Sequence, residues 1–201
     1  MFGRSRNAGG QEKVSGRGAL TLTASANGYP AGASFVRMVA SAKCVAWRAM
    51  GRIDDRLKEL GVTLPPPRAP LANYVPARRV GNLVYTAGQV SGTVEREIKG
   101  KLGAELTVEQ GREAARMCAL NCLAALLTVL GSLDGVKQLV RVGAFVNSAA
   151  GFNQQPMVAN GASDLFVDIF GDAGRHARTA VGVNELPAGF AVEVELIAEV
   201  A

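Results

Sequence analysis

The residues best suited to chemistry lie near the end of this 201-residue sequence, where Arg178 and Glu193 stand in two separate stretches with strand-like patterns. A guanidinium binds a carboxylate through two parallel hydrogen bonds, which fix both charge and direction. A glutamate can orient a water molecule or exchange a proton with a reacting group. Together, these residue types indicate a site for a small carboxylic acid that reacts with water.

Both residues also have a purely structural interpretation. An arginine on a strand commonly points into solvent or forms a surface salt bridge. Glu193 alternates with Glu195 and Glu199, which is the pattern of a polar strand face. The residue types alone therefore leave both interpretations open.

The single histidine, His176, limits the enzyme classes that fit this chain. A Ser-His-Asp or Cys-His arrangement would have to use it, and no serine or cysteine stands out in the sequence as its partner. We therefore expect a surface histidine beside a strand. The sequence also contains no phosphate-binding loop, no dinucleotide-binding glycine motif, no zinc-protease motif and no nucleophile elbow.

Three cysteines, Cys44, Cys118 and Cys122, are sparse and odd in number, which argues against a disulfide framework and suits a reducing, cytoplasmic compartment. Cys118 and Cys122 lie four residues apart on one side of a predicted helix. There is no second Cys/His pair at ligand spacing to complete a zinc site. We therefore expect no metal and two small buried thiols.

Charge is distributed unevenly along the chain. Residues 1–50 contain seven Lys/Arg and one acidic residue, whereas residues 51–201 contain fifteen Lys/Arg and sixteen acidic residues. A nucleic-acid-binding domain carries its basic patch on the folded part, so the near-neutral body argues against nucleic acid as a partner. No stretch approaches 18 consecutive apolar residues, and we therefore expect no membrane span.

Residues 1–49 are rich in Gly, Ser, Ala and Arg and lack a sustained period, so we expect a disordered or non-native extension. The segment is either an organelle-targeting peptide or translated upstream sequence with the natural start at Met50, and we favour the second. Residues 50–69 then indicate a short helix over Ile53–Leu60 and an extended spacer that contains Pro65-Pro66-Pro67.

Residues 70–201 alternate between short strands and helices, as expected of one compact domain. A turn at Gly81-Asn82 joins the first two strands, and the capping box Thr107-Val108-Glu109-Gln110 starts a long helix that ends at Gly131. In order, the expected elements are strands at Tyr74–Arg79 and Leu83–Ala87, this long helix, a strand at Leu139–Val146, a helix that starts in Asn153-Gln154-Gln155-Pro156 and ends at Gly171, and strands at Ala177–Val183 and Val192–Val200.

This β-β-α-β-α-β-β order predicts the α+β class, with a mixed sheet and two helices packed on one face. The apolar stripe of the first helix consists of Val108, Ala115, Cys118, Cys122, Leu126 and Val129. That of the second consists of Val158, Ala162, Leu165, Phe166 and Ile169. Because the other face of the sheet stays uncovered and partly apolar, we expect self-association to bury it.

Several segments together resemble the RidA/YjgF family. Arg178-Thr179-Ala180-Val181 is followed by Leu186-Pro187 and by a closing strand with alternating glutamates, Val192-Glu193-Val194-Glu195. Upstream, Asn73-Tyr74-Val75 is similar to the first strand of the family, and Val84-Tyr85-Thr86-Ala87-Gly88-Gln89 is similar to the second. The resemblance covers residues 70–201 and implies a chorismate-mutase-like sandwich.

The resemblance also implies roles for individual residues. Arg178 would bind the substrate carboxylate, Glu193 would orient water or exchange a proton, and Tyr74 would close the cleft. The other substrate-binding positions that it implies are Ala87, Gly88 and Ser163.

Three departures from the family pattern concern substrate range more than fold. Ala87 stands where the best-known members often have serine, and Ala180 stands where they often have cysteine. The family's asparagine on the second helix has two candidate positions here: an ungapped alignment gives Ser163, and Asn160 lies one turn earlier.

As the family implies, the expected activity is hydrolytic deamination of reactive 2-imino and enamine acids, such as 2-iminobutanoate, to 2-keto acids and ammonia. The family also implies a homotrimer with clefts between subunits, small carboxylate-bearing imines or enamines as partners, and no metal or organic cofactor. Two other functions fit the same fold. One is a non-catalytic small-metabolite-binding or regulatory module. The other is an endoribonuclease, against which the near-neutral domain and the lack of a histidine pair argue.

Overall fold

The computed structural model describes residues 52–67 and 72–201. The expectations for residues 1–49, for Met50 and for the end of the proline spacer lie outside these residues. The elements, in chain order, are α1 (Arg52–Glu59), β1 (Ala77–Val80), β2 (Leu83–Thr86), β3 (Gln89–Val90), α2 (Val108–Leu130), β4 (Val136–Asn147), α3 (Gln155–Phe170), β5 (Ala177–Val183) and β6 (Val192–Val200). Short 3-10 turns at Leu133–Gly135, Gly171–Gly174 and Pro187–Gly189 lie between them.

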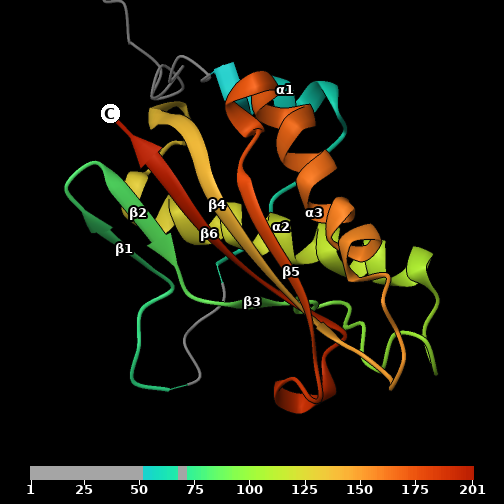
Figure 1. Ribbon diagram of the computed structural model, residues 1–201. Coiled ribbons are helices and arrows are strands. Elements are labelled where there is room, and N and C mark those ends of the chain that lie inside the picture. The colour runs from blue at the N-terminus through green and yellow to red at the C-terminus, as the bar shows by residue number, and fades with distance from the viewer. Residues whose placement is uncertain (1–51, 68–71) are drawn as a thin grey trace, which may run out of the picture. The chain divides into compact units, whose positions relative to one another are not determined.

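The strands form one mixed sheet in the order β1-β2-β6-β4-β5, and the short β3 also pairs with β6 (Figure 1). β4 and β5 are parallel, and all other neighbours are antiparallel. α3 is the crossover that a parallel pair requires. Figure 1 shows the strands passing in front of α2, and α2 contacts both α3 and the sheet. The predicted α+β class, the order of the main elements and the two helices on one face are confirmed.

β6 is the central strand and alternates strictly between two environments. The side chains that face the helices are buried, namely Val192, Val194, Leu196, Ala198 and Val200. From α2, Cys118 Sγ donates to the Val192 carbonyl oxygen at 3.2 Å, and Cys122 Sγ donates to that of Val194 at 3.4 Å. Burial raises the pKa of Cys122 to about 12. The prediction of two small buried thiols is confirmed.

Local signals set both ends of α2. The Thr107 nitrogen donates to Gln110 Oε1 at 2.9 Å, and the Gln110 nitrogen donates to Thr107 Oγ1 at 3.3 Å, so the capping box is complete. Gly131 adopts a left-handed conformation with φ of 70° and donates to the Leu127 carbonyl oxygen. The placement of Val129 in the core was wrong. Its side chain is 36% exposed, because the last turn of α2 is less covered than the turns before it.

By length and composition alone, α2 is apolar enough to cross a membrane. In the folded domain, however, its buried side chains belong to the same core as those of the sheet and of α3. The burial of α2 therefore identifies it as a core helix. No other helix within the two described ranges passes the same test of length and composition.

Two strands begin at residues other than those predicted. β1 starts at Ala77, so Tyr74 lies in a bend before the strand. The backbone nitrogen of Tyr74 donates to the Ala72 carbonyl oxygen. β4 starts at Val136, three residues before the predicted Leu139. Irregularities between Val136 and Gln138 and between Leu139 and Arg141 shift its pairing with β6. Such bulges break the two-residue period, so the start of β4 does not alternate in sequence.

The short N-terminal helix α1 is part of the same core. Ile53 and Leu57 are both buried in it, and the Ile53 nitrogen donates to Asp134 Oδ1 at 2.9 Å. The helix ends before Gly61, which has φ of 63°. The expected short helix is therefore present, and it packs against the domain that follows.

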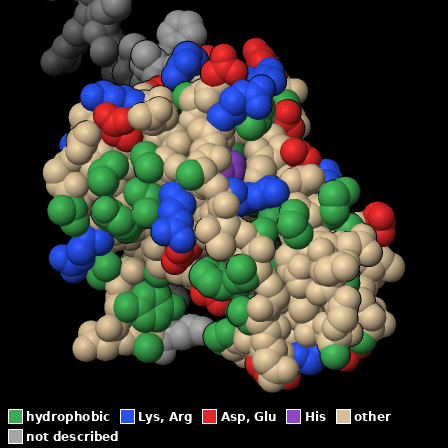
Figure 2. Space-filling view, viewed as in Figure 1, with side chains coloured by type: hydrophobic (Ala, Val, Ile, Leu, Met, Phe, Trp, Pro, Cys, Tyr) green, Lys and Arg blue, Asp and Glu red, His purple; other side chains and the backbone are tan. Residues whose placement is uncertain are grey.

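The face of the sheet opposite the helices is partly apolar. Tyr85 and Val181, on the non-core side of β2 and β5, are 41% and 40% exposed. On this side of the molecule, Figure 2 shows hydrophobic side chains gathered over β1 and β2, with basic and acidic side chains interspersed. The uncovered face has the composition that the sequence predicted, and burial by a second copy stays a prediction.

Close packing of α2 on α3 depends on Gly161. A Cβ atom there would lie 1.9 Å from the Arg112 carbonyl oxygen, a backbone atom that cannot swing away. We expect Gly161→Ala to lower the free energy of unfolding by about 1–3 kcal/mol, the usual cost of overpacking, measured by urea denaturation. Gly135→Ala is the control, because a Cβ there meets nothing within 4 Å. Equal stability of the two variants would contradict this account of the helix contact.

Candidate active site

Arg178 lies on the edge strand β5, and α3 holds its guanidinium. Nη1 donates to Asn160 Oδ1 at 2.8 Å and to Ser163 Oγ at 3.0 Å. Nη2 donates to the carbonyl oxygen of Pro156 at 3.3 Å. Although the side chain is exposed, these three bonds fix the plane of the guanidinium.

Part of the guanidinium stays available to a ligand. Arginine has five N–H donors, and three of those on Arg178 bond to α3. Among the residues that the structure describes, no acceptor contacts the Nε–H or the second Nη2–H. Nε and Nη2 are neighbours on a planar group, so the free donors suit a carboxylate.

A surface hollow of about 390 Å³ opens beside these donors, and its lining consists of Ser163, Asp164, Val167, Arg175, His176 and Arg178. Arg175 brings a second guanidinium, whose Nε bonds to Asp172 Oδ1 at 3.2 Å in an exposed pair. An exposed pair of this kind contributes little energy and exchanges easily with solvent. Two arginines at one hollow make it suitable for an anion.

His176 lies in the same hollow and is partly buried. Its Nδ1 is 2.7 Å from the Gly174 carbonyl oxygen, and its Nε2 is 3.0 Å from Ser163 Oγ. His176 lies beside β5 as expected, but the expectation that it has no serine partner is wrong, because the fold brings Ser163 of α3 to the ring. Burial lowers the pKa of His176, the bond to Gly174 raises it, and the charge of Arg178 lowers it further.

Both candidates for the family's helix position contact Arg178. Ser163 was predicted as a substrate-binding residue, and Asn160 was only an alternative for the same position. Residues three apart lie on the same side of a helix, so the spacing was the signal that both could reach one partner. The structure thus adds Asn160 to the candidate site.

Glu193 lies beside Gly88, away from Arg178. β2 and β3 pair with β6 on either side of a break at Ala87-Gly88. A Cβ on Gly88 would lie 1.7 Å from Glu193 Oε1, so the carboxylate lies directly over this glycine. Burial raises the pKa of Glu193, and the nearby Glu195 carboxylate raises it further. Two of the predicted positions, Glu193 and Gly88, therefore meet here, and Ala87 is the residue before Gly88.

Within one chain, Arg178 and Glu193 do not meet. Arg178 pairs in register with the buried Val142 and shares its helix-covered side of the sheet. Glu193 pairs with Phe145 and lies on the uncovered side, because alternate residues of β6 point to opposite faces. Tyr74 precedes β1, at the sheet edge opposite β5, and is 49% exposed. A cleft that combines all three from different subunits stays a prediction.

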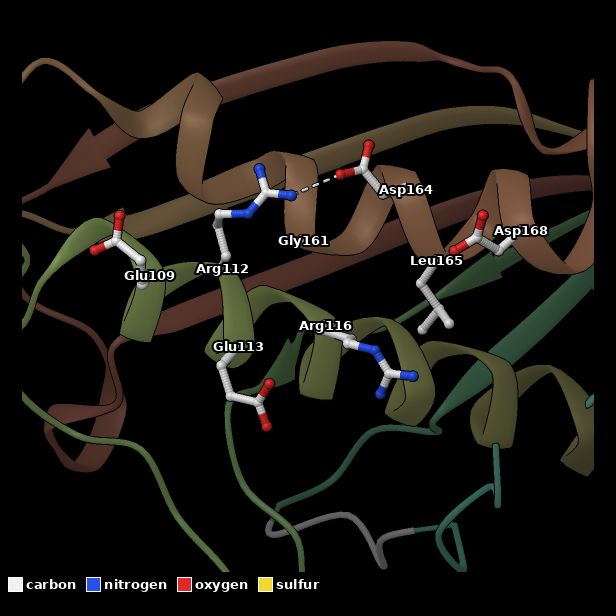
Figure 3. A pocket seen from close by; sticks show the side chains of 8 residues that line it. All are labelled: Glu109, Arg112, Glu113, Arg116, Gly161, Asp164, Leu165 and Asp168. Carbon is white, nitrogen blue, oxygen red and sulfur yellow. Dashed lines mark hydrogen bonds and ion pairs between the residues drawn. The ribbon is translucent and has the colours of Figure 1, made fainter. Parts of the chain in front are cut away.

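A second hollow, of about 280 Å³, lies between the outer sides of α2 and α3 (Figure 3). Arg112 of α2 points across it to Asp164 of α3, with Nη2 and Oδ2 2.8 Å apart. Four acidic side chains and two arginines line it, with Glu109, Glu113 and Arg116 also from α2 and Asp168 also from α3. Acidic side chains outnumber the arginines in this groove, whereas two arginines and one acidic residue line the hollow beside Arg178, so the hollow beside Arg178 is the better candidate for an anion.

A mixed sheet with two covering helices defines an α+β protein, and the arginine held at the edge of this sheet is its candidate site for an anion. The sequence profile described as "YjgF/chorismate mutase-like, putative endoribonuclease" matches residues 54–200. The chain therefore belongs to the RidA/YjgF family, and its sandwich is of the chorismate-mutase-like type.

This chain is similar to proteins from several organisms. Protein TCP17 of Trypanosoma cruzi is 46% identical over 153 residues, which cover 75% of this chain and 96% of that protein. A 2-iminobutanoate/2-iminopropanoate deaminase of Dermatophagoides farinae is 30% identical over 128 residues, covering 64% and 86%. The crystal structure of Atu1372, a protein of unknown function from Agrobacterium tumefaciens, has a TM-score of 0.69 and 40% identity, covering 74% and 92%.

The raised pKa of Glu193 predicts a pH-dependent stability. Because the folded state favours the neutral carboxyl of Glu193, the stability that this group contributes is fully present below its ordinary pKa. This stability is lost as pH rises through the raised pKa. Glu193→Gln is permanently neutral and should be more stable than the wild type at neutral pH, with a difference that vanishes at about pH 4. Urea denaturation at both pH values measures this, with the exposed Glu95→Gln as control. A constant difference across the pH range would contradict the prediction.

Proposed function

We propose that this protein hydrolyses reactive 2-imino or enamine acids to 2-keto acids and ammonia. The observation that carries the proposal is the guanidinium of Arg178, which α3 holds in one plane while two donors stay free. An α-imino acid carries a carboxylate that such donors recognise in a fixed direction. The family and the deaminase relative support the same substrate class.

The reaction mainly requires that the substrate and a water molecule be positioned. The carbon of a C=N bond is already electrophilic, so a carboxylate anchor and a placed water supply much of what the reaction needs. In one chain the carboxylate of Glu193 lies on the other face of the sheet from Arg178. For the roles of Glu193 as water-orienting group and Tyr74 as cleft-closing group, we therefore propose a homotrimer in which neighbouring subunits bring these residues to Arg178.

A non-catalytic metabolite-binding or regulatory module is the second candidate. The same separation of Arg178 from Glu193 favours it, since a lone chain offers an anion site without the Glu193 carboxylate. An endoribonuclease activity has support from the description of the family. The near balance of charge over residues 51–201 argues against it.

A coupled assay separates the first two functions. An amino-acid oxidase generates 2-imino acids in situ, and release of the 2-keto acid is followed with wild-type protein, Arg178→Ala and Arg178→Lys. We expect wild-type acceleration and a loss of at least about 10²-fold in kcat/KM for both variants, because lysine keeps the charge but cannot bind in bidentate fashion. Arg116→Ala, on the outer side of α2, is the control.

Each outcome of this assay points to one function. Normal turnover by Arg178→Ala would remove Arg178 from the site. Product binding that depends on Arg178, without turnover by the wild type, would favour the binding module. RNA cleavage by the wild type would favour the endoribonuclease.

A further inference from the structure

A continuous chain of hydrogen bonds connects Arg178 with the single histidine of the sequence. Arg178 Nη1 donates to Ser163 Oγ at 3.0 Å, and Ser163 Oγ lies 3.0 Å from His176 Nε2. The other ring nitrogen, Nδ1, lies 2.7 Å from the Gly174 carbonyl oxygen. Three elements contribute to this chain, namely β5, α3 and the turn before β5.

The chemistry of the groups fixes the direction of every bond. A carbonyl oxygen can only accept, so Nδ1 of His176 carries the proton and Nε2 is the acceptor. Ser163 therefore donates its hydroxyl proton to Nε2 while it accepts from Arg178. A hydroxyl oxygen has two lone pairs, and one of those on Ser163 is left for a water in the hollow.

The surroundings of the ring favour a neutral base. The edge of the Phe166 ring packs against His176 with centroids 5.8 Å apart and planes at 86°. The charged groups around the hollow are Arg178 of β5, Asp164 of α3, and Arg175. Asp164 is paired with Arg112 and Arg175 with Asp172. Burial and the charge of Arg178 lower the pKa of the ring, against the opposite effect of Gly174.

We infer that Ser163 and His176 are the proton relay of the Arg178 site, with His176 acting through the hydroxyl of Ser163 on the water and amine of an imine bound at Arg178. This inference rests on the proposed function. It gives the site a titratable group that comes from the same chain as Arg178. Glu193 of the same chain does not supply this group, because it lies on the other face of the sheet from Arg178.

The relay balances every proton of the hydrolysis. Water adds to the carbon of the protonated imine, the C=N electron pair moves to nitrogen, and a water proton passes through Ser163 to His176. The protonated ring returns this proton to the amine nitrogen of the carbinolamine. The C–N bond then breaks, ammonia leaves with the electron pair, and the remaining hydroxyl proton passes to His176 as C=O forms. His176 finally gives that proton to the departing ammonia or to solvent.

The first test is the pH profile of the coupled assay. We expect kcat/KM of the wild type to fall as pH drops through the pKa of His176. His176→Asn keeps a donor for Gly174 but cannot titrate, and Ser163→Ala breaks the relay. Both should lose about 10²-fold or more in kcat, and His176→Asn should also lose the acidic limb. Asp168→Asn, on the outer side of α3, is the control. The relay would be overturned if either variant kept kcat within about threefold of the wild type, or if His176→Asn kept the acidic limb.

The second test does not require turnover. Because the sequence has one histidine, the imidazole signals in a nitrogen-correlated NMR spectrum belong to His176 without assignment. We expect the Nδ1–H tautomer. We also expect Ser163→Ala to raise the pKa of the ring, since it removes a bond that stabilises the neutral form. The Nε2–H tautomer, or a pKa unchanged by Ser163→Ala, would overturn the relay. Absence of wild-type turnover with the expected NMR result would instead overturn the proposed reaction.

Discussion

The alternation of β6 at the centre of the sheet is the constraint on which the rest of the domain depends. Every second side chain of this strand is buried under the helices, and α2 is tied to its backbone through the thiols of Cys118 and Cys122. The same alternation places Glu193 on the uncovered face. Burial of the core and separation of the acidic group from the helix side are therefore one geometric fact, since successive residues of a strand point to opposite faces.

The arginine at the sheet edge gains its precision from a helix. An exposed guanidinium on a strand would sample many rotamers, and the ordering of such a side chain costs free energy when a ligand binds. Here the guanidinium is already ordered in the folded chain, because it donates to Asn160, Ser163 and the Pro156 carbonyl oxygen of α3. Asp164, which lines the hollow beside Arg178, also forms the ion pair with Arg112 of α2. The position of α3 therefore couples the outer groove to the orientation of Arg178.

Local signals were read correctly from the sequence, and contacts between distant elements were not. The capping box at Thr107 and the left-handed Gly131 fix α2 through neighbouring residues alone. The start of β4 was missed because irregularities between Val136 and Gln138 and between Leu139 and Arg141 break its alternation. The contact between Ser163 and His176 was missed because it joins a helix to the residue before a strand, and no spacing rule encodes that approach. Arg178 and Gly88 were located by resemblance, but the face on which each lies became clear only from the pairing register.

The position of β6 in the chain has a consequence for biosynthesis. It is the last of the strands to emerge from the ribosome, yet it lies between β2 and β4, which are made earlier. Until it arrives, the hairpin of β1 and β2 has no partner on its inner side, and the apolar stripes of α2 and α3 have no sheet centre to cover. Pairing across such a distance in sequence makes folding slow. Nascent chains that expose strand edges and apolar surface in this way are prone to aggregate and are the natural clients of chaperones.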